Sequence, residues 1–372
     1  MTRDALVIAM LTVAVLGIAE AGVRVLDRAR LGHWTHTSLV TFLDQMRAVT
    51  RIYREHPFLN VGPNEGTHAA PLGRLTSFNS LGYRSPERPR AKPPGTMRIV
   101  CAGGSTTFDL LAADDGTWPS QLEAQLRRRG VPVEVWNAGF PGWCSVENMI
   151  SLAIRDVDLA PDIVILLQGF NDLQPATQLP FNAQYEGFHT RAIRVTHGID
   201  MLPVPWYQHS LLFEKLRATL LGSRPLVMTL PGQRDIVMRE EIPPEAVAVF
   251  ERNVRSFIAV AREHGASILL VTQPVRLRAA SAEADAGWFE RWIPGLRGKR
   301  LPAELERLND VLRKLGGGPV TVADAALEID WTDQDFGDPV HYGPSGSSKL
   351  ASFLTDRLDA MPRPGPDRRP TE

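Results

Sequence analysis

The stretch Met97–Ala102, MRIVCA, runs directly into the turn Gly103-Gly104-Ser105-Thr106-Thr107. A short, mostly apolar run that ends in two glycines is typical of a buried parallel strand followed by a tight turn. The glycines permit tight backbone geometry, which leaves the hydroxyl of Ser105 exposed at the edge of the sheet. The stretch therefore predicts the first strand of an α/β body, with a serine where that strand ends.

Strands and helices alternate along the rest of the chain. Further strands are expected at Val131–Trp136, Asp162–Leu167, Ser267–Thr272 and Val320–Ala323, and helices at Trp118–Arg129, Val146–Leu159, Glu245–His264, Leu305–Leu315 and Ser345–Leu358. In Glu245–His264 the apolar residues fall on one helical face. This order predicts a doubly wound, mostly parallel sheet with helices on both faces, which is a three-layer α/β/α fold.

Composition limits the classes of function. The chain has 372 residues, 44% hydrophobic and 22% charged, with a formal net charge of -1. This charge balance does not create the strong positive potential that attracts nucleic acid, so no nucleic-acid partner is expected. Cys101 and Cys144 are too few for a disulfide framework or a cysteine-built zinc site; one bridge between them stays open, and two free thiols are favoured. The scattered histidines lack metal-ligand spacing, so neither metal nor cofactor is expected.

The N-terminus departs from this globular average. From Ala5 to Ala19 every residue except Thr12 is apolar or glycine, and Glu20 and Arg24 are spaced to pair across one helical turn. The uncharged run is shorter than the roughly 20 residues that span a bilayer. Ala19-Glu20-Ala21 has the form of a signal-peptidase site. An uncleaved membrane anchor is the preferred interpretation, with a cleaved signal or a buried or surface-lying helix as alternatives.

The domain organisation follows from these features. We expect an anchor or signal segment at 1–30, a juxtamembrane region and linker at 31–95, a catalytic body at 96–361 and a disordered tail at 362–372. Two insertions, 173–241 and 274–300, lack a sustained period and leave predicted strand ends, where α/β proteins build their sites. They are candidates for lids or substrate walls. The interpretation that they are only surface insertions with local packing has equal weight. Their aromatic residues Trp206, Tyr207, Trp288 and Trp292 are candidates to line an acyl or sugar pocket.

A late acid-x-x-base element, Asp338-Pro339-Val340-His341, supplies partners for Ser105. A serine hydroxyl is a weak nucleophile until a base removes its proton, and His341 can be that base. Asp338 can bond the other imidazole nitrogen and set its tautomer. The competing interpretation of 103–107 is a phosphate-cradling loop, but the lysine of that motif is missing.

Two further turns place hydrogen-bond donors at the same edge. Asn137-Ala138-Gly139-Phe140-Pro141-Gly142 follows the second predicted strand, and Gly169-Phe170-Asn171-Asp172 follows the third. Acyl transfer needs donors aimed at the oxyanion of the tetrahedral intermediate. The backbone N–H groups of Ser105 and Gly142 and the side-chain amide of Asn171 are candidates, whereas Asp172 is expected to brace the loop that carries Asn171.

With these four turns in order, the chain resembles the SGNH/GDSL hydrolase superfamily. The resemblance implies a flavodoxin-like sheet, a triad and an oxyanion hole at the residues just named. The first block has Gly104 and Thr106 where the family's common Gly-Asp-Ser-Leu form has Asp and Leu, which puts the subfamily in doubt. The segment Asn79–Arg84 and the N-terminal apolar run resemble bacterial membrane-tethered members.

The expected activity is that of a serine esterase acting on a short-chain acyl ester of a carbohydrate, lipid or other alcohol. Two alternatives are an O-acyltransferase of cell-envelope polymers with the same triad and a catalytically silent envelope-binding module. The resemblance favours a membrane-anchored body in the periplasm or at the cell surface, or a secreted one if 1–21 is cleaved. The arginines after the apolar run, Arg24, Arg28 and Arg30, would instead keep the body cytoplasmic by a positive-inside count.

Overall fold

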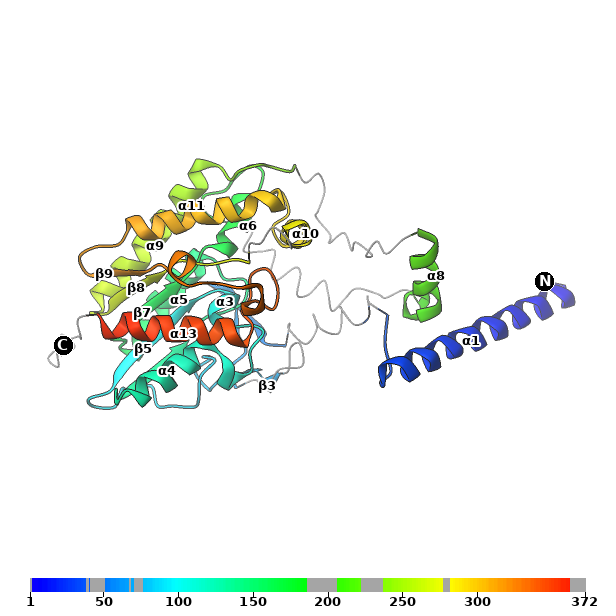
Figure 1. Cartoon of the computed structure of the whole chain (residues 1–372), viewed down its shortest axis with the longest axis horizontal. Helices are drawn as coiled ribbons and strands as arrows, with labels where there is room; N and C mark the ends of the chain where they lie inside the picture. Colours follow the sequence, from blue (N-terminus) through cyan, green and yellow to red (C-terminus); the bar gives the residue numbers. More distant parts are fainter. Residues whose placement is uncertain are drawn as a thin grey trace. The chain divides into compact units, whose positions relative to one another are not determined.

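The computed structural model describes residues 2–37, 40, 51–66, 68–69, 76–185, 206–221, 237–276 and 282–361. These residues belong to two compact units (Figure 1). One consists of Met1–Thr50 with Val195–Gln233, and the other of Arg51–Arg194 with Arg234–Glu372. The expected disordered tail, 362–372, lies outside the described residues.

The larger unit is built on a sheet of five parallel strands. They are β5 (Met97–Gly103), β6 (Val133–Asn137), β7 (Ile163–Leu167), β8 (Ser267–Val271) and β9 (Val320–Ala323), in the order β6-β5-β7-β8-β9. After β5, the chain adds β6 on one side of it and then β7, β8 and β9 on the other side. The strand order therefore reverses between β5 and β7. In open α/β sheets, such a switch point is where the carboxyl ends of the strands form a crevice for a site. The predicted parallel sheet is confirmed.

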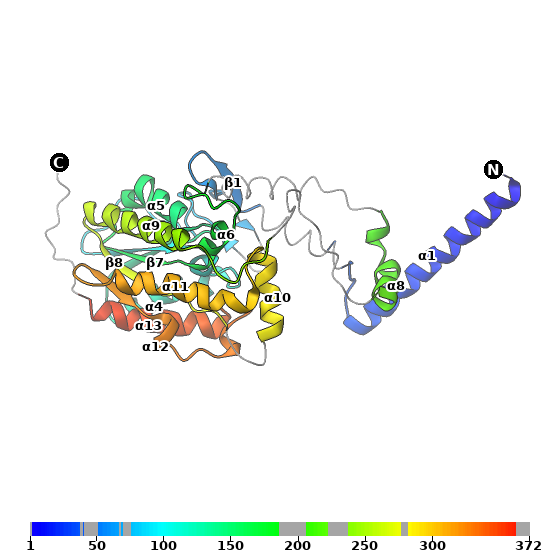
Figure 2. The ribbon, with the colours of Figure 1, turned by 90° about the horizontal axis from the view of Figure 1, so that it is seen from above.

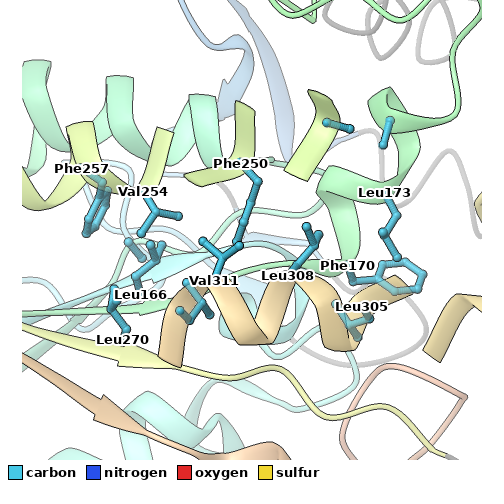
Figure 3. Close-up of a cluster of buried hydrophobic side chains, with 14 of the residues drawn as sticks. Leu166, Phe170, Leu173, Phe250, Val254, Phe257, Leu270, Leu305, Leu308 and Val311 are labelled. Atoms are coloured by element: carbon cyan, nitrogen blue, oxygen red, sulfur yellow. The ribbon is translucent and has the colours of Figure 1, made fainter. Parts of the chain in front are cut away.

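Helices cover both faces of this sheet (Figure 1; Figure 2). On one face lie α4 (Trp118–Arg128) and α13 (Pro344–Asp359), and on the other α5 (Ser145–Ile154), α9 (Pro244–Glu263) and α11 (Leu301–Lys314). Side chains alternate along a strand, so Ile165 packs toward α4 and α13, whereas Leu166 packs toward α9 and α11. Figure 3 shows Leu166 and Leu270 beside Phe250, Val254 and Val311 in that second core.

Short elements connect these layers. They are α3 (Ser105–Phe108), η2 (Asp114–Gly116), η3 (Asp156–Leu159), η4 (Phe170–Asp172), α6 (Leu173–Ala176), α10 (Ala282–Trp292), η6 (Gly298–Arg300), α12 (Ala325–Glu328) and η7 (Asp333–Asp335). The helix expected at Val146–Leu159 ends at Ile154 and continues as η3. The insertion 274–300 contains α10, whose buried apolar positions Ala286 and Phe289 are too few to reveal a period in the sequence. Cys101 and Cys144 are buried free thiols.

The larger unit begins at Arg51, earlier than the boundary at 96 expected from the sequence. Residues before the sheet form the antiparallel pair β1 (Tyr53–His56) and β2 (Asn60–Pro63) and the short pair β3 (His68–Ala69) and β4 (Thr76–Ser77). Their apolar side chains pack with residues of the turns after β5 and β6, in a cluster of Ile52, Leu59, Val61, Phe78, Phe108, Phe140 and Trp143. These residues follow no regular period, so their burial could not be read from the sequence.

Arg84 joins this N-terminal layer to the turn that follows α3. Its guanidinium, fully buried, donates to the carbonyl oxygens of Phe108, Asp109 and Ala112 at 2.7–3.0 Å and to the Asp114 carboxylate at 3.0 Å. One side chain therefore binds three carbonyl oxygens and one carboxylate. Because α3 begins at Ser105, Arg84 fixes the path of the chain directly after the predicted nucleophile.

The smaller unit contains α1 (Arg3–Leu31), η5 (Trp206–His209) and α8 (Leu211–Leu221). With 29 residues and a mean hydropathy of 2.3 in its most apolar window, α1 is long and apolar enough to cross a membrane, as an anchor or a signal sequence. The predicted pairing within α1 is present, with Arg24 Nε 2.7 Å from Glu20 Oε1. Part of the insertion 173–241 thus belongs to the unit that contains α1.

We expect Arg84→Ala to destabilise the larger unit by about 3–5 kcal/mol, because it leaves buried acceptors and a charge without their partner. The matched control is Arg54→Ala, since Arg54 pairs with Glu65 in an exposed ion pair, with side chains 46% and 41% exposed; that change should cost less than about 1 kcal/mol. Thermal unfolding followed by tryptophan fluorescence measures both. Equal Tm values for the two variants would contradict the role given to Arg84.

Candidate active site

The turn after β5 is shaped by a close approach of Asn171. A Cβ at position 104 would lie 2.4 Å from Asn171 Nδ2, so a larger residue there would displace the Asn171 amide. Ser105 begins α3 directly after this glycine and is half-buried. The Thr107 hydroxyl donates to the carbonyl oxygens of Ala102 and Leu167 at 3.3 and 3.4 Å, which ties α3 to the ends of β5 and β7.

Ser105, His341 and Asp338 form a continuous hydrogen-bonded chain. Ser105 Oγ lies 2.7 Å from His341 Nε2, and His341 Nδ1 lies 2.7 Å from Asp338 Oδ2. Asp338 Oδ1 accepts the backbone N–H groups of Val340 and His341 at 2.9 and 2.8 Å. Burial by itself raises the pKa of the Asp338 carboxyl, but the hydrogen bonds from His341 and Val340 outweigh it and hold that pKa below its usual value. The carboxylate is therefore charged and oriented toward the imidazole.

Asn171 and Gly142 come from the two neighbouring strand ends. Asn171 lies in η4 after β7 and donates its side-chain amide to the carbonyl oxygen of Trp143 at 2.8 Å. Gly142 precedes Trp143 in the turn after β6 and has φ +85°, a conformation that favours glycine. The structure thus brings Asn171 next to the Ser105 turn, and links it to the loop that carries Gly142.

Asp172, next to Asn171, holds this arrangement in place through hydrogen bonds to Ser145 and Gln168. Its buried carboxylate accepts the N–H and hydroxyl of Ser145 at 3.1 and 2.5 Å and the amide of Gln168 at 2.7 Å. Burial raises the pKa of Asp172 to about 6, although these hydrogen bonds act in the opposite direction. The Gln168 amide also donates to the Trp143 carbonyl at 3.2 Å, so the acceptor of Asn171 is itself held by the network.

Gln273 is a site residue that the sequence analysis missed. Its Oε1 accepts the backbone N–H of Phe170 at 2.9 Å, and its Nε2 donates to Thr106 Oγ1 at 3.4 Å. It therefore connects the residue before Asn171 to the residue after Ser105. A signal was present, because Gln273 follows shortly after the buried strand β8, as Asn171 follows β7.

The insertion 274–300 brings aromatic side chains to His341. The Trp288 ring centroid, in α10, lies 6.5 Å from that of His341 and 5.7 Å from that of Trp292, whose side chain is 46% exposed. Of the aromatic residues proposed for the insertion 173–241, Tyr207 lies in the smaller unit, and the side chain of Trp206 lies outside the described residues.

Comparison with known families agrees with this arrangement. A sequence model of the GDSL-like Lipase/Acylhydrolase family matches residues 101–349, a span that includes the serine, asparagine, aspartate and histidine described above. The chain belongs to this family. It is therefore an SGNH-type hydrolase, and the departures at Gly104 and Thr106 are variations within the GDSL-like family.

Solved structures of low sequence identity also match this hydrolase. A GDSL-like lipase from Bacteroides thetaiotaomicron VPI-5482 is 13% identical with a TM-score of 0.40, covering 71% of this chain and 88% of that chain. The lipase/acylhydrolase from Enterococcus faecalis is 15% identical with a TM-score of 0.41, covering 72% and 99%. A mutant acetyl-xylooligosaccharide esterase from Geobacillus Stearmophilus is 13% identical with a TM-score of 0.43, covering 72% and 96%. No curated protein matches the chain.

Asp109 places a buried acid directly behind the hydrolase's serine turn. Its backbone N–H donates to the Ser105 carbonyl at 2.9 Å, and its carboxylate accepts the backbone N–H of Trp118 at 2.8 Å. Burial raises the pKa of Asp109 to about 6, although the hydrogen bond from Trp118 and the nearby charge of Arg84 act in the opposite direction. The folded protein thus holds this proton more tightly than the unfolded chain does.

We expect Asp109→Asn to change how stability depends on pH. The Asp109 carboxyl favours the folded state fully below about pH 4, and this contribution is lost as pH rises through about 6. Asparagine keeps an acceptor for Trp118 and tolerates the φ of 63° at this position, but it does not ionise. Between pH 4 and 7, the variant should therefore gain roughly 1–3 kcal/mol relative to the wild type, measured by urea unfolding.

The matched control for this measurement is Asp158→Asn. Asp158 pairs with Arg90 on the surface, where its side chain is 53% exposed. Its stability difference from the wild type should stay flat across the same pH range. A flat difference for Asp109→Asn as well would show that the Asp109 carboxyl is not buried as described.

Proposed function

We propose that the protein is a serine esterase that hydrolyses a short-chain acyl ester of a carbohydrate, lipid or other alcohol. The observation that carries this proposal is the hydrogen-bonded chain from Ser105 through His341 to Asp338, with both side-chain bonds at 2.7 Å. That geometry provides a nucleophile, a base within reach of it and an acid that orients the base. Membership of a hydrolase family agrees with it.

In the proposed mechanism, Ser105 Oγ attacks the ester carbonyl carbon while His341 Nε2 takes the hydroxyl proton. Asp338 holds the proton on Nδ1 and stabilises the imidazolium that forms. His341 then protonates the leaving alcohol, which departs and leaves an acyl group on Ser105. Water, deprotonated by His341, attacks this acyl-enzyme and releases the free acid together with the regenerated serine.

The oxyanion of each tetrahedral intermediate would be stabilised by the N–H groups of Ser105 and Gly142 and the amide of Asn171. The bond from Asn171 Nδ2 to the Trp143 carbonyl uses one amide hydrogen and fixes the plane of the amide. The second hydrogen can then donate to substrate. Because the donor is oriented before substrate arrives, little reorganisation is needed during the reaction.

We also propose that α1 anchors the protein in a membrane, with the catalytic unit outside the cytoplasm. The length and hydropathy of α1 support the membrane location. The resemblance of the N-terminal region to bacterial membrane-tethered SGNH hydrolases supports the orientation. In this arrangement the substrate is a small or polymer-linked ester of the cell envelope or its surroundings.

We expect Ser105→Ala to abolish both ester hydrolysis and labelling by a fluorophosphonate probe. Asp338→Asn should lower kcat by about 10³- to 10⁴-fold. Asn171→Ala should lower it by about 10²- to 10³-fold, with little change in KM because the oxyanion forms after binding. The control is Ser352→Ala, an exposed hydroxyl on α13, which should label and turn over as the wild type does. Equal labelling of wild type and Ser105→Ala would refute the nucleophile.

The tryptophan pair of α10 is proposed to contact the alcohol part of the ester. His341 must reach the leaving oxygen to protonate it, and Trp288 is the aromatic ring beside His341. The exposed face of Trp292 extends this surface outward. A flat apolar ring suits an aromatic alcohol or the C–H face of a sugar.

We expect Trp292→Ala to raise KM by about 3- to 10-fold for acetyl esters of sugars or aromatic alcohols. KM for methyl acetate should not change, since its alcohol is too small to reach the ring. Trp292→Phe should restore most of the loss. If both kinds of ester lose affinity alike, the ring supports the fold of α10 rather than the substrate.

A further inference from the structure

One side of α8 presents apolar side chains outward. Phe213, Leu216 and Leu220 are 40%, 51% and 77% exposed. At 100° per residue they lie within about 60° of one another around the helix axis. The Tyr207 ring, 38% exposed, lies 5.2 Å from that of Phe213 and extends the surface. We call these four residues the apolar stripe.

The other side of α8 is fixed to α1. The Glu20 carboxylate accepts the Ser210 hydroxyl at 2.8 Å and the backbone N–H groups of Leu211 and Leu212 at 3.1 and 2.9 Å. One side chain of α1 therefore accepts two of the backbone donors at the start of α8, while Ser210 Oγ accepts that of Phe213. One turn further along α8, Lys215 Nζ lies 3.0 Å from Asp27 Oδ1. Two contacts on separate turns of α1 set both the position and the direction of α8.

These contacts also set the level of α8 relative to a bilayer. Glu20 is the first charged residue after the uncharged run Ala5–Ala19. A charged side chain is unfavourable at the bilayer centre and is placed at the boundary of the hydrocarbon. Trp34, 55% exposed and stacked under the Arg28 guanidinium at 4.7 Å, is the kind of residue enriched at such a boundary. The start of α8 is therefore held where α1 leaves the hydrocarbon.

We propose that α8 is an interfacial helix whose apolar stripe lies in the lipid surface, and that α1 is retained as the anchor that holds it there. An amphipathic helix at this level can bury its apolar side chains at the boundary of headgroups and acyl chains. Cleavage after Ala21 would remove Glu20 and with it the acceptor of the Leu211 and Leu212 N–H groups. The insertion 173–241 then supplies a second membrane contact, independent of the chemistry at Ser105.

Depth-dependent quenching tests this proposal in the full chain. Leu220→Cys, labelled with NBD, is reconstituted into vesicles of equal parts phosphatidylcholine and phosphatidylglycerol with brominated acyl chains. The native thiols Cys101 and Cys144 are both fully buried, so the label goes to the new cysteine. Val13→Cys, within α1, reports insertion of the anchor. Leu327→Cys, a leucine 68% exposed in the larger unit, is the matched control.

We expect a blue-shifted NBD emission and quenching by brominated lipid at positions 13 and 220, but neither effect at 327. Adding Glu20→Ala should reduce quenching at position 220 and leave that at 13 unchanged, because only the acceptor of those N–H groups is lost. Quenching at 13 without quenching at 220 would overturn the proposal. So would a signal at 220 that depends on protein copies per vesicle rather than on bromine, which would indicate self-association. An intact mass lacking residues 1–21 in the membrane-bound protein would also overturn it.

Discussion

The close approach of the Asn171 amide to Gly104 is the contact on which the rest of the site depends. A Cβ at position 104 would lie 2.4 Å from Nδ2, so the Asn171 amide keeps this position because residue 104 has no side chain. These two strands are neighbours in the sheet, at the point where the strand order reverses. The glycine at the position where the family's common form has Asp thus leaves room for this amide. It brings a polarised amide beside Ser105 without changing the strand that carries the serine.

Keeping the turns in contact requires charged groups inside the protein. Asp172 beneath Asn171, Asp109 behind Ser105, and Arg84 at the turn after α3 are each almost fully buried. Burying a charge is unfavourable unless hydrogen bonds replace its hydration. Each group has such hydrogen bonds from a neighbouring segment. For Asp109 and Asp172 they replace the hydration only in part, since burial still raises the pKa of each to about 6. The groups therefore fix where the turns lie rather than adding much net stability, since apolar residues of similar volume could stabilise the core equally well.

The sequence predicted what depends on local pattern. Apolar runs identified β5, β7, β8 and β9, and the polar residues that follow the strands pointed to Ser105 and Asn171. Arg84 and the aromatic cluster of the N-terminal layer act across long separations and follow no period, so the sequence pattern there is that of a linker. Gln273 had the same signal as Asn171, but a single glutamine has no motif to distinguish it. Regular elements are recoverable from short windows, whereas contacts between irregular segments depend on the completed fold.

The two insertions illustrate why position at a strand end does not fix a segment's role. The insertion 274–300 places Trp288 beside His341. Within the insertion 173–241, residues 206–221 instead contact α1, through Glu20 and Asp27. In the proposed membrane arrangement, Glu20 would be unfavourable at the hydrocarbon boundary without a partner, and the start of α8 supplies donors and the positive end of a helix dipole. Glu20 thus has partners in both helices, Arg24 in α1 and the N–H groups of Leu211 and Leu212 in α8. The sequence of α8 is therefore constrained by its contacts with α1, whereas the sequence of α10 is constrained by its position beside His341.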